Sequence, residues 1–246
     1  MTNVEINTSH VKVPNNDLEI DAYLAQPTNG GTYGAIIVIQ EIFGVNSHIR
    51  DVTVRIAEQG YVAIAPAMFQ RVAPGFDVGY SQEDMQRGFQ YMQQIKAPEV
   101  MSDIQATVAY LKTLPNVKAS EIGAIGFCFG GHVAYLAATL PDIKAAASFY
   151  GGGIATSGLG ADTATINRTS EIKGTIYAFF GTKDSLIPQE QNQQIEAELK
   201  KHHVNHRVFR YDADHGFFCD QRASYNPEAA ADAWQHVLEL FQNNLK

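Results

Sequence analysis

The chain has 246 residues, of which 45% are hydrophobic, and carries a formal net charge of −8 at pH 7. Its length and apolar content suit one domain with a substantial core. The acidic balance and the lack of a stripe of Lys and Arg exclude an ordinary nucleic-acid surface, because phosphate binding needs clustered cations.

The hydrophobic pattern predicts an antiparallel hairpin followed by strands that alternate with helices. Polar and apolar residues alternate at 4–8 and at 18–24, which is typical of the two strands of a hairpin. Later strands are expected at residues 34–40, 61–65, 120–126, 143–150, 174–181 and 204–211. Helices are expected at residues 47–59, 82–95, 98–113, 130–139, 188–202 and 227–243. This order predicts a single domain, residues 1–246, of the α/β class, with a mostly parallel central sheet and helices on both faces.

Residues 126–131 (GFCFGG) have the spacing of a nucleophile elbow in which cysteine takes the nucleophile's place. They lie between a predicted strand and a predicted helix, which is the context that such an elbow needs. The N-terminus of the helix would face the sulfur of Cys128 and favour its thiolate form. Cys128 is therefore a candidate nucleophile, although a free cysteine is more commonly a small buried apolar residue.

Two later loops supply partners for Cys128 in the order that this type of site requires, first an acid and then a histidine. Asp184 follows the predicted strand 174–181, and His215 follows the strand 204–211. Asp214 is a rival acid, but adjacent side chains in an extended loop usually diverge, so Asp184 is preferred. The other histidines considered are expected to be solvated or core residues: His202, His203, His206 and His236.

Along nearly its whole length the chain resembles the dienelactone hydrolase family of α/β-hydrolases. The resemblance rests on the elbow and on residues 40–46 (QEIFGVN), 149–151 (FYG), 181–184 (GTKD) with 187–188 (IP), and 214–217 (DHGF). It implies an α/β-hydrolase fold and a catalytic triad of Cys128, Asp184 and His215. It also implies that Glu41 lies beside the thiol, and that the backbone N–H groups of Ile42 and Phe129 form the oxyanion hole.

Glu41 follows an apolar strand, at the carboxyl end where open α/β sheets bind ligands. A carboxylate near Cys128 would accept a hydrogen bond from the thiol and oppose the thiolate by like-charge repulsion. In the family this arrangement looks protective, with the glutamate released to take the proton when substrate arrives. A carboxylate in the first turn of a helix, or in a surface ion pair, is the alternative interpretation.

Family members that open dienelactones hold the substrate carboxylate with arginines. Arg87, with Tyr91 one helical turn further on, matches the family spacing. The second family arginine, four residues after the histidine, is replaced here by Cys219, and Arg222 lies three residues beyond it. This departure puts dienelactone itself in doubt as the substrate and leaves the natural ester open.

Arg71 and Tyr150 are further candidates for contact with the substrate, Arg71 from a strand-end loop and Tyr150 from the FYG segment. Each arginine considered has an alternative interpretation as a solvated or ion-paired surface residue.

The predicted activity is hydrolysis of a small ester or lactone through a thioester on Cys128. Two alternatives remain: a carboxylesterase or thioesterase for an unrelated small acyl substrate, and a non-catalytic thiol sensor on the same fold. No HExxH, paired CxxC or phosphate-binding glycine loop is present, so we expect no metal and no cofactor.

The first residues have neither the charged nor the apolar segment of a signal peptide, and two cysteines make no disulfide framework. We therefore expect a cytoplasmic protein without membrane or nucleic-acid partners, either a monomer or a weak homodimer.

Overall fold

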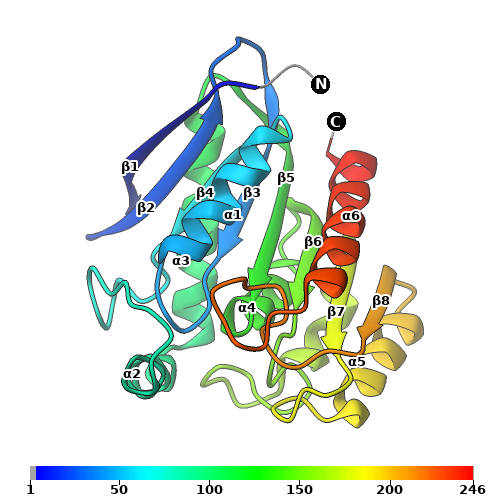
Figure 1. The fold of residues 1–246 in the computed structure, drawn as a ribbon. Helices are drawn as coiled ribbons and strands as arrows, with labels where there is room; N and C mark the ends of the chain where they lie inside the picture. Colours follow the sequence, from blue (N-terminus) through cyan, green and yellow to red (C-terminus); the bar gives the residue numbers. More distant parts are fainter. Residues whose placement is uncertain (1–3, 246) are drawn as a thin grey trace.

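Eight strands form one mixed sheet in the computed structural model, which describes residues 4–245 (Figure 1). The strands are β1 (Ile6–Asn15), β2 (Leu18–Pro27), β3 (Tyr33–Ile39), β4 (Val62–Pro66), β5 (Val117–Phe127), β6 (Ile143–Phe149), β7 (Thr175–Gly181) and β8 (Asn205–Tyr211). Their order across the sheet is β1-β2-β4-β3-β5-β6-β7-β8. The first two pair antiparallel, β2 runs antiparallel to β4, and the remaining pairs are parallel. The predicted parallel sheet with an N-terminal hairpin is confirmed.

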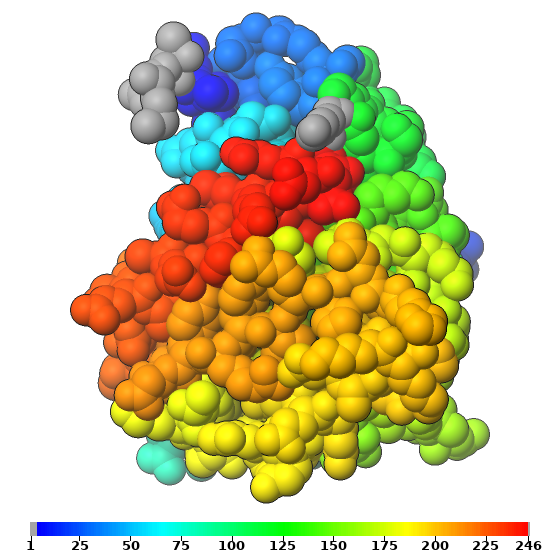
Figure 2. All heavy atoms as spheres, turned by 90° about the vertical axis from the view of Figure 1, so that its right-hand side faces the viewer, coloured from blue at the N-terminus to red at the C-terminus, as the bar shows by residue number. Residues whose placement is uncertain are grey.

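Helices cover both faces of this sheet, as predicted (Figure 1). They are α1 (Ser47–Glu58), α2 (Gln82–Met92), α3 (Ala97–Thr113), α4 (Phe129–Ala137), α5 (Gln189–Lys201) and α6 (Pro227–Asn244), with a 3₁₀ helix, η1 (Thr165–Glu171). Helices α1 and α6 lie on one face, and α3 and α4 on the other. Viewed from the β8 edge, the surface is formed largely by α6, β8 and α5 (Figure 2). None of the helices within residues 4–245 has both the length and the apolar content needed to cross a membrane.

The prediction was wrong at several boundaries. The first strand does not lie at residues 4–8, because β1 starts at Ile6 and continues to Asn15 along all ten residues of β2. The chain then reverses at Asn16, whose φ of 53° is one that asparagine tolerates. Strand β5 also begins three residues early, since Val117 pairs with Tyr33. The helix predicted at 82–95 ends at Met92, and η1 was not predicted.

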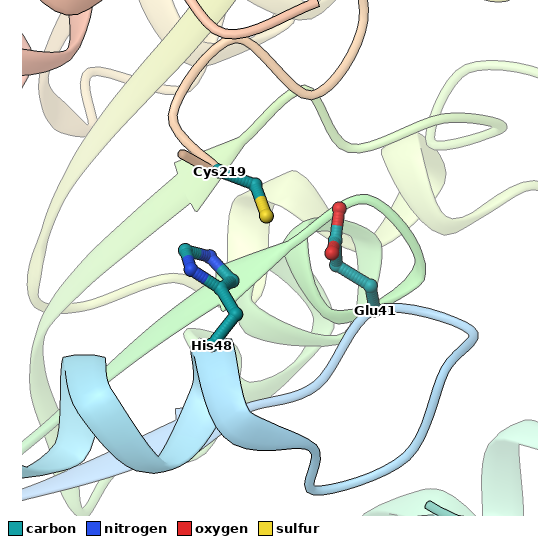
Figure 3. Close-up of side chains that lie close together, drawn as sticks. All are labelled: Glu41, His48 and Cys219. Atoms are coloured by element: carbon teal, nitrogen blue, oxygen red, sulfur yellow. The ribbon is translucent and has the colours of Figure 1, made fainter. Parts of the chain in front are cut away.

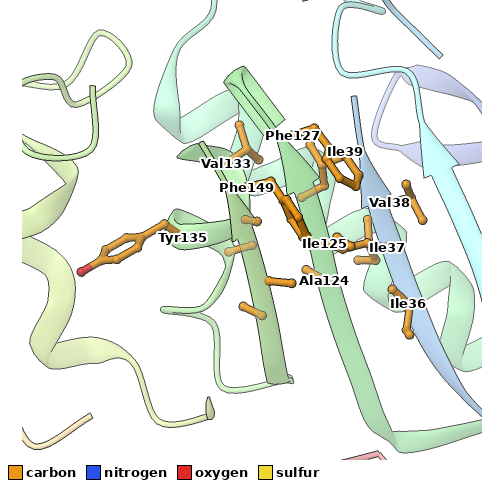
Figure 4. Packing of buried hydrophobic residues seen from close by; sticks show 14 of the residues in the cluster. Ile36, Ile37, Val38, Ile39, Ala124, Ile125, Phe127, Val133, Tyr135 and Phe149 are labelled. Carbon is orange, nitrogen blue, oxygen red and sulfur yellow. The ribbon is translucent and has the colours of Figure 1, made fainter. Parts of the chain in front are cut away.

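The centre of the sheet is buried on both sides, which explains its nearly unbroken apolar sequence. Ile36 to Ile39 of β3 are fully buried, and so are Ala124 and Ile125 of the neighbouring β5. Figure 4 shows these side chains packed with Phe127 and Phe149, near the carboxyl ends of β5 and β6. Because the strands are parallel, the loops that follow them gather along one edge of the sheet.

At that edge the turn between β5 and α4 packs directly against neighbouring backbone. A Cβ built on Gly130 would lie 2.3 Å from the carbonyl oxygen of Ile39, and one on Gly131 would lie 2.2 Å from that of Phe149. Contacts this close leave no room for a side chain. The start of α4 is therefore fixed between β3 and β6.

We predict that Gly131→Ala lowers the free energy of unfolding by about 3 kcal/mol, the upper part of the range for overpacking, because the rigid Phe149 carbonyl cannot yield. The matched control is Gly152→Ala. A Cβ there meets only Ile187, at 3.8 Å, so the change should be about 1 kcal/mol or less in either direction. Urea denaturation of both variants measures the difference, and equal effects would contradict the close-packing explanation.

Candidate functional site

Cys128 occupies a strained turn between the end of β5 and the start of α4. Its φ of 56° and ψ of −115° are rare for a residue with a side chain and cost about 1–3 kcal/mol. The backbone holds this conformation, since the N–H of Cys128 donates to the carbonyl oxygen of Phe149 at 3.0 Å. The side chain is half-buried, and Phe129, the first residue of α4, follows at once. The positive end of the α4 dipole therefore faces the sulfur.

The structure brings Asp184 and His215 into direct contact. The Nδ1–H of His215 donates to Oδ2 of Asp184 at 2.7 Å, and both side chains are buried. The other carboxylate oxygen of Asp184 accepts from the backbone N–H groups of Leu186 and Ile187, at 2.8 and 3.2 Å. The short loop after β7 thus fixes the carboxylate, and the carboxylate orients the imidazole ring.

Cys128 acts electrostatically on His215. Burial alone would lower the pKa of this histidine, but the negative charge of Cys128 and the hydrogen bond to Asp184 outweigh burial and raise the pKa to about 10. Nε2 of the ring is buried and has no hydrogen-bond partner among residues 4–245. The rival acid, Asp214, accepts a hydrogen bond from the backbone N–H of His215 at 2.8 Å. The ring contact therefore belongs to Asp184.

Glu41 forms a buried ion pair with Arg222. Nη1 of Arg222 donates to Oε1 of Glu41 at 2.9 Å, and Glu41 is fully buried. The guanidinium also lies over the rings of Phe43 and Tyr80, at 5.8 and 5.9 Å from their centroids. Oε2 of Glu41 has no hydrogen-bond partner in the described part of the chain. Arg222 thus reaches the glutamate from the loop between β8 and α6.

Tyr150 lies fully buried beside His215, with the two rings edge to face at a centroid distance of 5.1 Å. Burial first, and then the negative charge of Glu41, raise the pKa of its phenol, which is therefore neutral. Its hydroxyl has no partner among the residues that the structure describes. Tyr150 is therefore a neutral hydroxyl close to the charged groups of the site.

Cys219 and His48 lie next to Glu41, and their side chains point toward its carboxylate and toward each other (Figure 3). The thiol of Cys219 donates to the hydroxyl of Tyr80 at 3.2 Å. Burial and the charge of Glu41 raise the pKa of this thiol to about 11. His48 is 2% exposed, and burial lowers its pKa. Sequence reasoning missed His48 and Tyr80, since no motif marks either residue.

A pocket of about 450 Å³ opens beside these groups. Its lining includes His215, Arg222, Tyr80, Met85 and Leu186. The Leu186 side chain is 58% exposed, so the pocket has an apolar residue at its rim. Arg222 gives this pocket a positive charge, and His215 lines the same pocket.

Three predicted contact residues lie elsewhere. Arg87 is exposed and lies over the ring of Phe76, at 5.3 Å, and Tyr91 packs edge-on against the same ring. Neither is among the pocket's lining residues in the range 4–245. Arg71 donates two hydrogen bonds to the buried carboxylate of Asp103, at 2.6 and 3.2 Å, which gives it a structural role.

The two predicted oxyanion donors, Ile42 and Phe129, are each the residue after a predicted catalytic residue. Ile42 comes after Glu41 at the end of β3, and Phe129 comes after Cys128 at the end of β5. Both are buried, at 2% and 3% exposure. Since β3 and β5 are neighbours in the sheet, the two backbone segments lie at adjacent strand ends.

The model of the dienelactone hydrolase family matches residues 20–245. The chain belongs to the dienelactone hydrolase family. A Synechocystis protein provisionally named a carboxymethylenebutenolidase is 58% identical over 244 residues, which cover 99% of each chain. An Escherichia coli K12 protein with the same provisional name is 31% identical, over 94% of this chain and 84% of its own.

Solved structures agree with this family and fold. The crystal structure of a provisionally assigned dienelactone hydrolase from Klebsiella pneumoniae superposes with a TM-score of 0.88 at 29% identity, over 97% of this chain and 99% of that one. Acylaminoacyl peptidase from Pyrococcus horikoshii superposes with a TM-score of 0.73 at 18% identity. The match covers 98% of this chain and 42% of the peptidase chain. This more distant similarity shows the fold alone. The α/β-hydrolase fold implied by the sequence resemblance is thereby confirmed.

The raised pKa of His215 gives a direct test of the site. In Cys128→Ala the negative charge beside the ring is gone, so the imidazolium is less stabilised and its pKa should fall from about 10 toward the ordinary range. Nitrogen-detected NMR titration of the ring measures it. Asp214→Asn is the control and should leave the pKa unchanged. An unchanged value in Cys128→Ala would show that the sulfur carries no negative charge near the ring.

Proposed function

We propose that the protein hydrolyses a small ester or lactone through a covalent thioester on Cys128. The observation that carries this proposal is the 2.7 Å hydrogen bond from His215 to Asp184. The negative charge of Cys128, at the strained turn after β5, raises the pKa of the same histidine. The relatives' names support the substrate class. Besides the carboxymethylenebutenolidases, a Bradyrhizobium relative, 30% identical over 88% of this chain, is provisionally named a 2-oxo-3-(5-oxofuran-2-ylidene)propanoate lactonase.

The first half of the reaction forms the thioester. The Cys128 thiolate attacks the carbonyl carbon, a C–S bond forms, and the carbonyl electrons move onto oxygen, where the N–H groups of Ile42 and Phe129 stabilise the charge. When the C=O bond re-forms, the C–O bond to the leaving alkoxide breaks. The His215 imidazolium gives that alkoxide its proton. In a lactone the leaving group remains attached to the acyl chain, so the ring opens.

The second half releases the acid. Neutral His215 takes a proton from a water molecule, whose oxygen attacks the thioester carbon. The C–S bond then breaks, and sulfur leaves as the thiolate. His215 is an imidazolium again, so the starting charges are restored. Asp184 keeps the ring oriented through both halves and stabilises its positive charge.

The Glu41–Arg222 pair suggests how an anionic substrate prepares the site. A substrate carboxylate in the pocket would compete with Glu41 for the Arg222 guanidinium. Once released, Glu41 can take the proton of any Cys128 that is still a thiol, which adds to the thiolate that is paired with the His215 imidazolium. Charge-assisted hydrogen bonds of this kind contribute about 1.5–3 kcal/mol. Among the arginines considered, Arg222 is preferred over Arg87 because it lines the pocket.

Cys128→Ala should reduce turnover of p-nitrophenyl acetate by about 10³-fold or more, because no other group can replace the nucleophile. Cys219→Ser, the matched change at the other cysteine, should retain most of the activity. Mass spectrometry of the quenched wild-type enzyme should find the acetyl group on Cys128. Iodoacetamide labelling of Cys128 without any turnover would instead indicate a thiol sensor.

Anion recognition is best tested in a Glu41→Gln background, since removal of Arg222 alone would leave a buried carboxylate unpaired, at a cost of about 3–5 kcal/mol. Adding Arg222→Ala there should reduce kcat/KM about 10- to 100-fold for a lactone that carries a carboxylate. The methyl ester of the same lactone should change far less. Arg87→Ala is the comparison variant. A selective loss in Arg87→Ala alone would assign the anion site to α2.

A further inference from the structure

A second group of chemically reactive side chains lies next to the proposed active site, and it joins Glu41 of that site to two residues that the reaction does not use, His48 and Cys219. Glu41, His48 and Cys219 come from the loop after β3, the first turn of α1 and the loop after β8 (Figure 3). One ligand atom from each lies within 4.8 Å of the other two, and all three residues are buried. Carboxylate, imidazole and thiol are the donor types of protein zinc sites.

Two of these donors have a buried atom without a partner. Within residues 4–245, neither Oε2 of Glu41 nor Nε2 of His48 has a hydrogen-bond partner. Glu41 is fully buried, and His48 is 2% exposed. Such atoms are costly to bury unsatisfied, since each loses its bonds to water. The proposed steps at Cys128 use no atom of His48, and both unpartnered atoms can donate an electron pair, so their arrangement suits a ligand that accepts electron pairs.

The spacing suits a small cation. Zinc bonds of about 2.0–2.3 Å in a tetrahedral arrangement place ligand atoms roughly 3.2–3.8 Å apart. The ligand atoms now lie within 4.8 Å of one another, so each has to move by only about 1 Å to reach this spacing. Three protein ligands leave the fourth position for water.

The surroundings resemble the outer shell of a metal site. Asp220, which is largely exposed, lies 4.0 Å from Nδ1 of His48, the ring nitrogen on which a carboxylate would orient a ligating imidazole if it moved within hydrogen-bond distance. Arg222 holds Oε1 of Glu41 and leaves Oε2 for the ion. Arg222 and Tyr80 both contact the cluster and both line the 450 Å³ pocket, so the cluster lies directly behind the pocket wall.

We propose that Glu41, His48 and Cys219 form a binding site for a zinc-type divalent cation. The Cys219 thiol loses its proton as the metal–sulfur bond forms, so each ion that binds releases one proton to solvent. Glu41 supplies the second negative charge, and His48 binds as a neutral imidazole. The sequence gives no warning of this site, because its ligands lie at positions 41, 48 and 219 without a local motif.

The test uses Cys128→Ser protein, because a zinc ion could otherwise bind the thiolate of Cys128 with His215. With only two cysteines in the chain, Cys219 is then the sole thiol. Calorimetry should find one Zn²⁺ bound per chain. Adding Cys219→Ser or His48→Gln should weaken binding by at least about 100-fold, the upper end of the effect of losing an outer-shell partner. His10→Gln, at an exposed histidine far along the sheet on β1, is the matched control and should change nothing.

Cobalt gives an answer that needs no substitution in the cluster. Co²⁺ bound to Cys128→Ser should show the thiolate-to-metal charge-transfer band in the near ultraviolet, which only Cys219 can supply. Circular dichroism of each metal-free variant establishes that it is folded. The proposal is overturned if Co²⁺ shows no such band, or if folded Cys219→Ser and His48→Gln variants bind Zn²⁺ as tightly as their parent. Because none of these readouts depends on turnover, failure here is distinct from failure of the proposed esterase activity.

Discussion

The contact between the N-terminus of α4 and the backbones of β3 and β6 is the constraint on which the site depends. Gly130 and Gly131 let this helix approach the carbonyl groups of Ile39 and Phe149 more closely than any side chain permits. The strand that leads into it must then turn sharply, and Cys128 takes up the strain of that turn. The same contact places Cys128 at the edge of the sheet where the residues that follow β3 and β6 lie, which include Glu41 and Tyr150.

Buried charge is the second organising feature. A fully buried carboxylate such as Glu41 persists only with a partner, and Arg222 supplies it from a loop at the other end of the sequence. The pair ties the end of β3 to the loop after β8, which also carries His215. Any anion that draws Arg222 away therefore leaves the buried Glu41 carboxylate without its ion-pair partner. Under the proposed function, recognition of charge in the pocket is therefore coupled to the ionisation of Cys128.

Much of the fold followed from the sequence, because strands buried on both faces and short loops leave a strong pattern. The pairing of Asp184 with His215 followed too, since both stand directly after parallel strands. The length of β1 did not, because its exposed positions resemble loop residues and only pairing with β2 defines them. The Arg222 contact and the position of His48 depend on how a loop folds back over α1. No local pattern in the sequence encodes that approach.

Cys219 stands where the family resemblance places an arginine, and Arg222, three residues further on, pairs with Glu41; this shift bears on how such proteins are classified. In an alignment column the positive charge is lost, and a scheme that infers substrate from conserved positions would assign this chain to a different specificity group. In this structure a positive charge, that of Arg222, pairs with Glu41, and the thiol of Cys219 lies beside the same glutamate. Specificity in proteins of this type is therefore better compared by which side chain reaches a given oxygen atom than by which column it occupies.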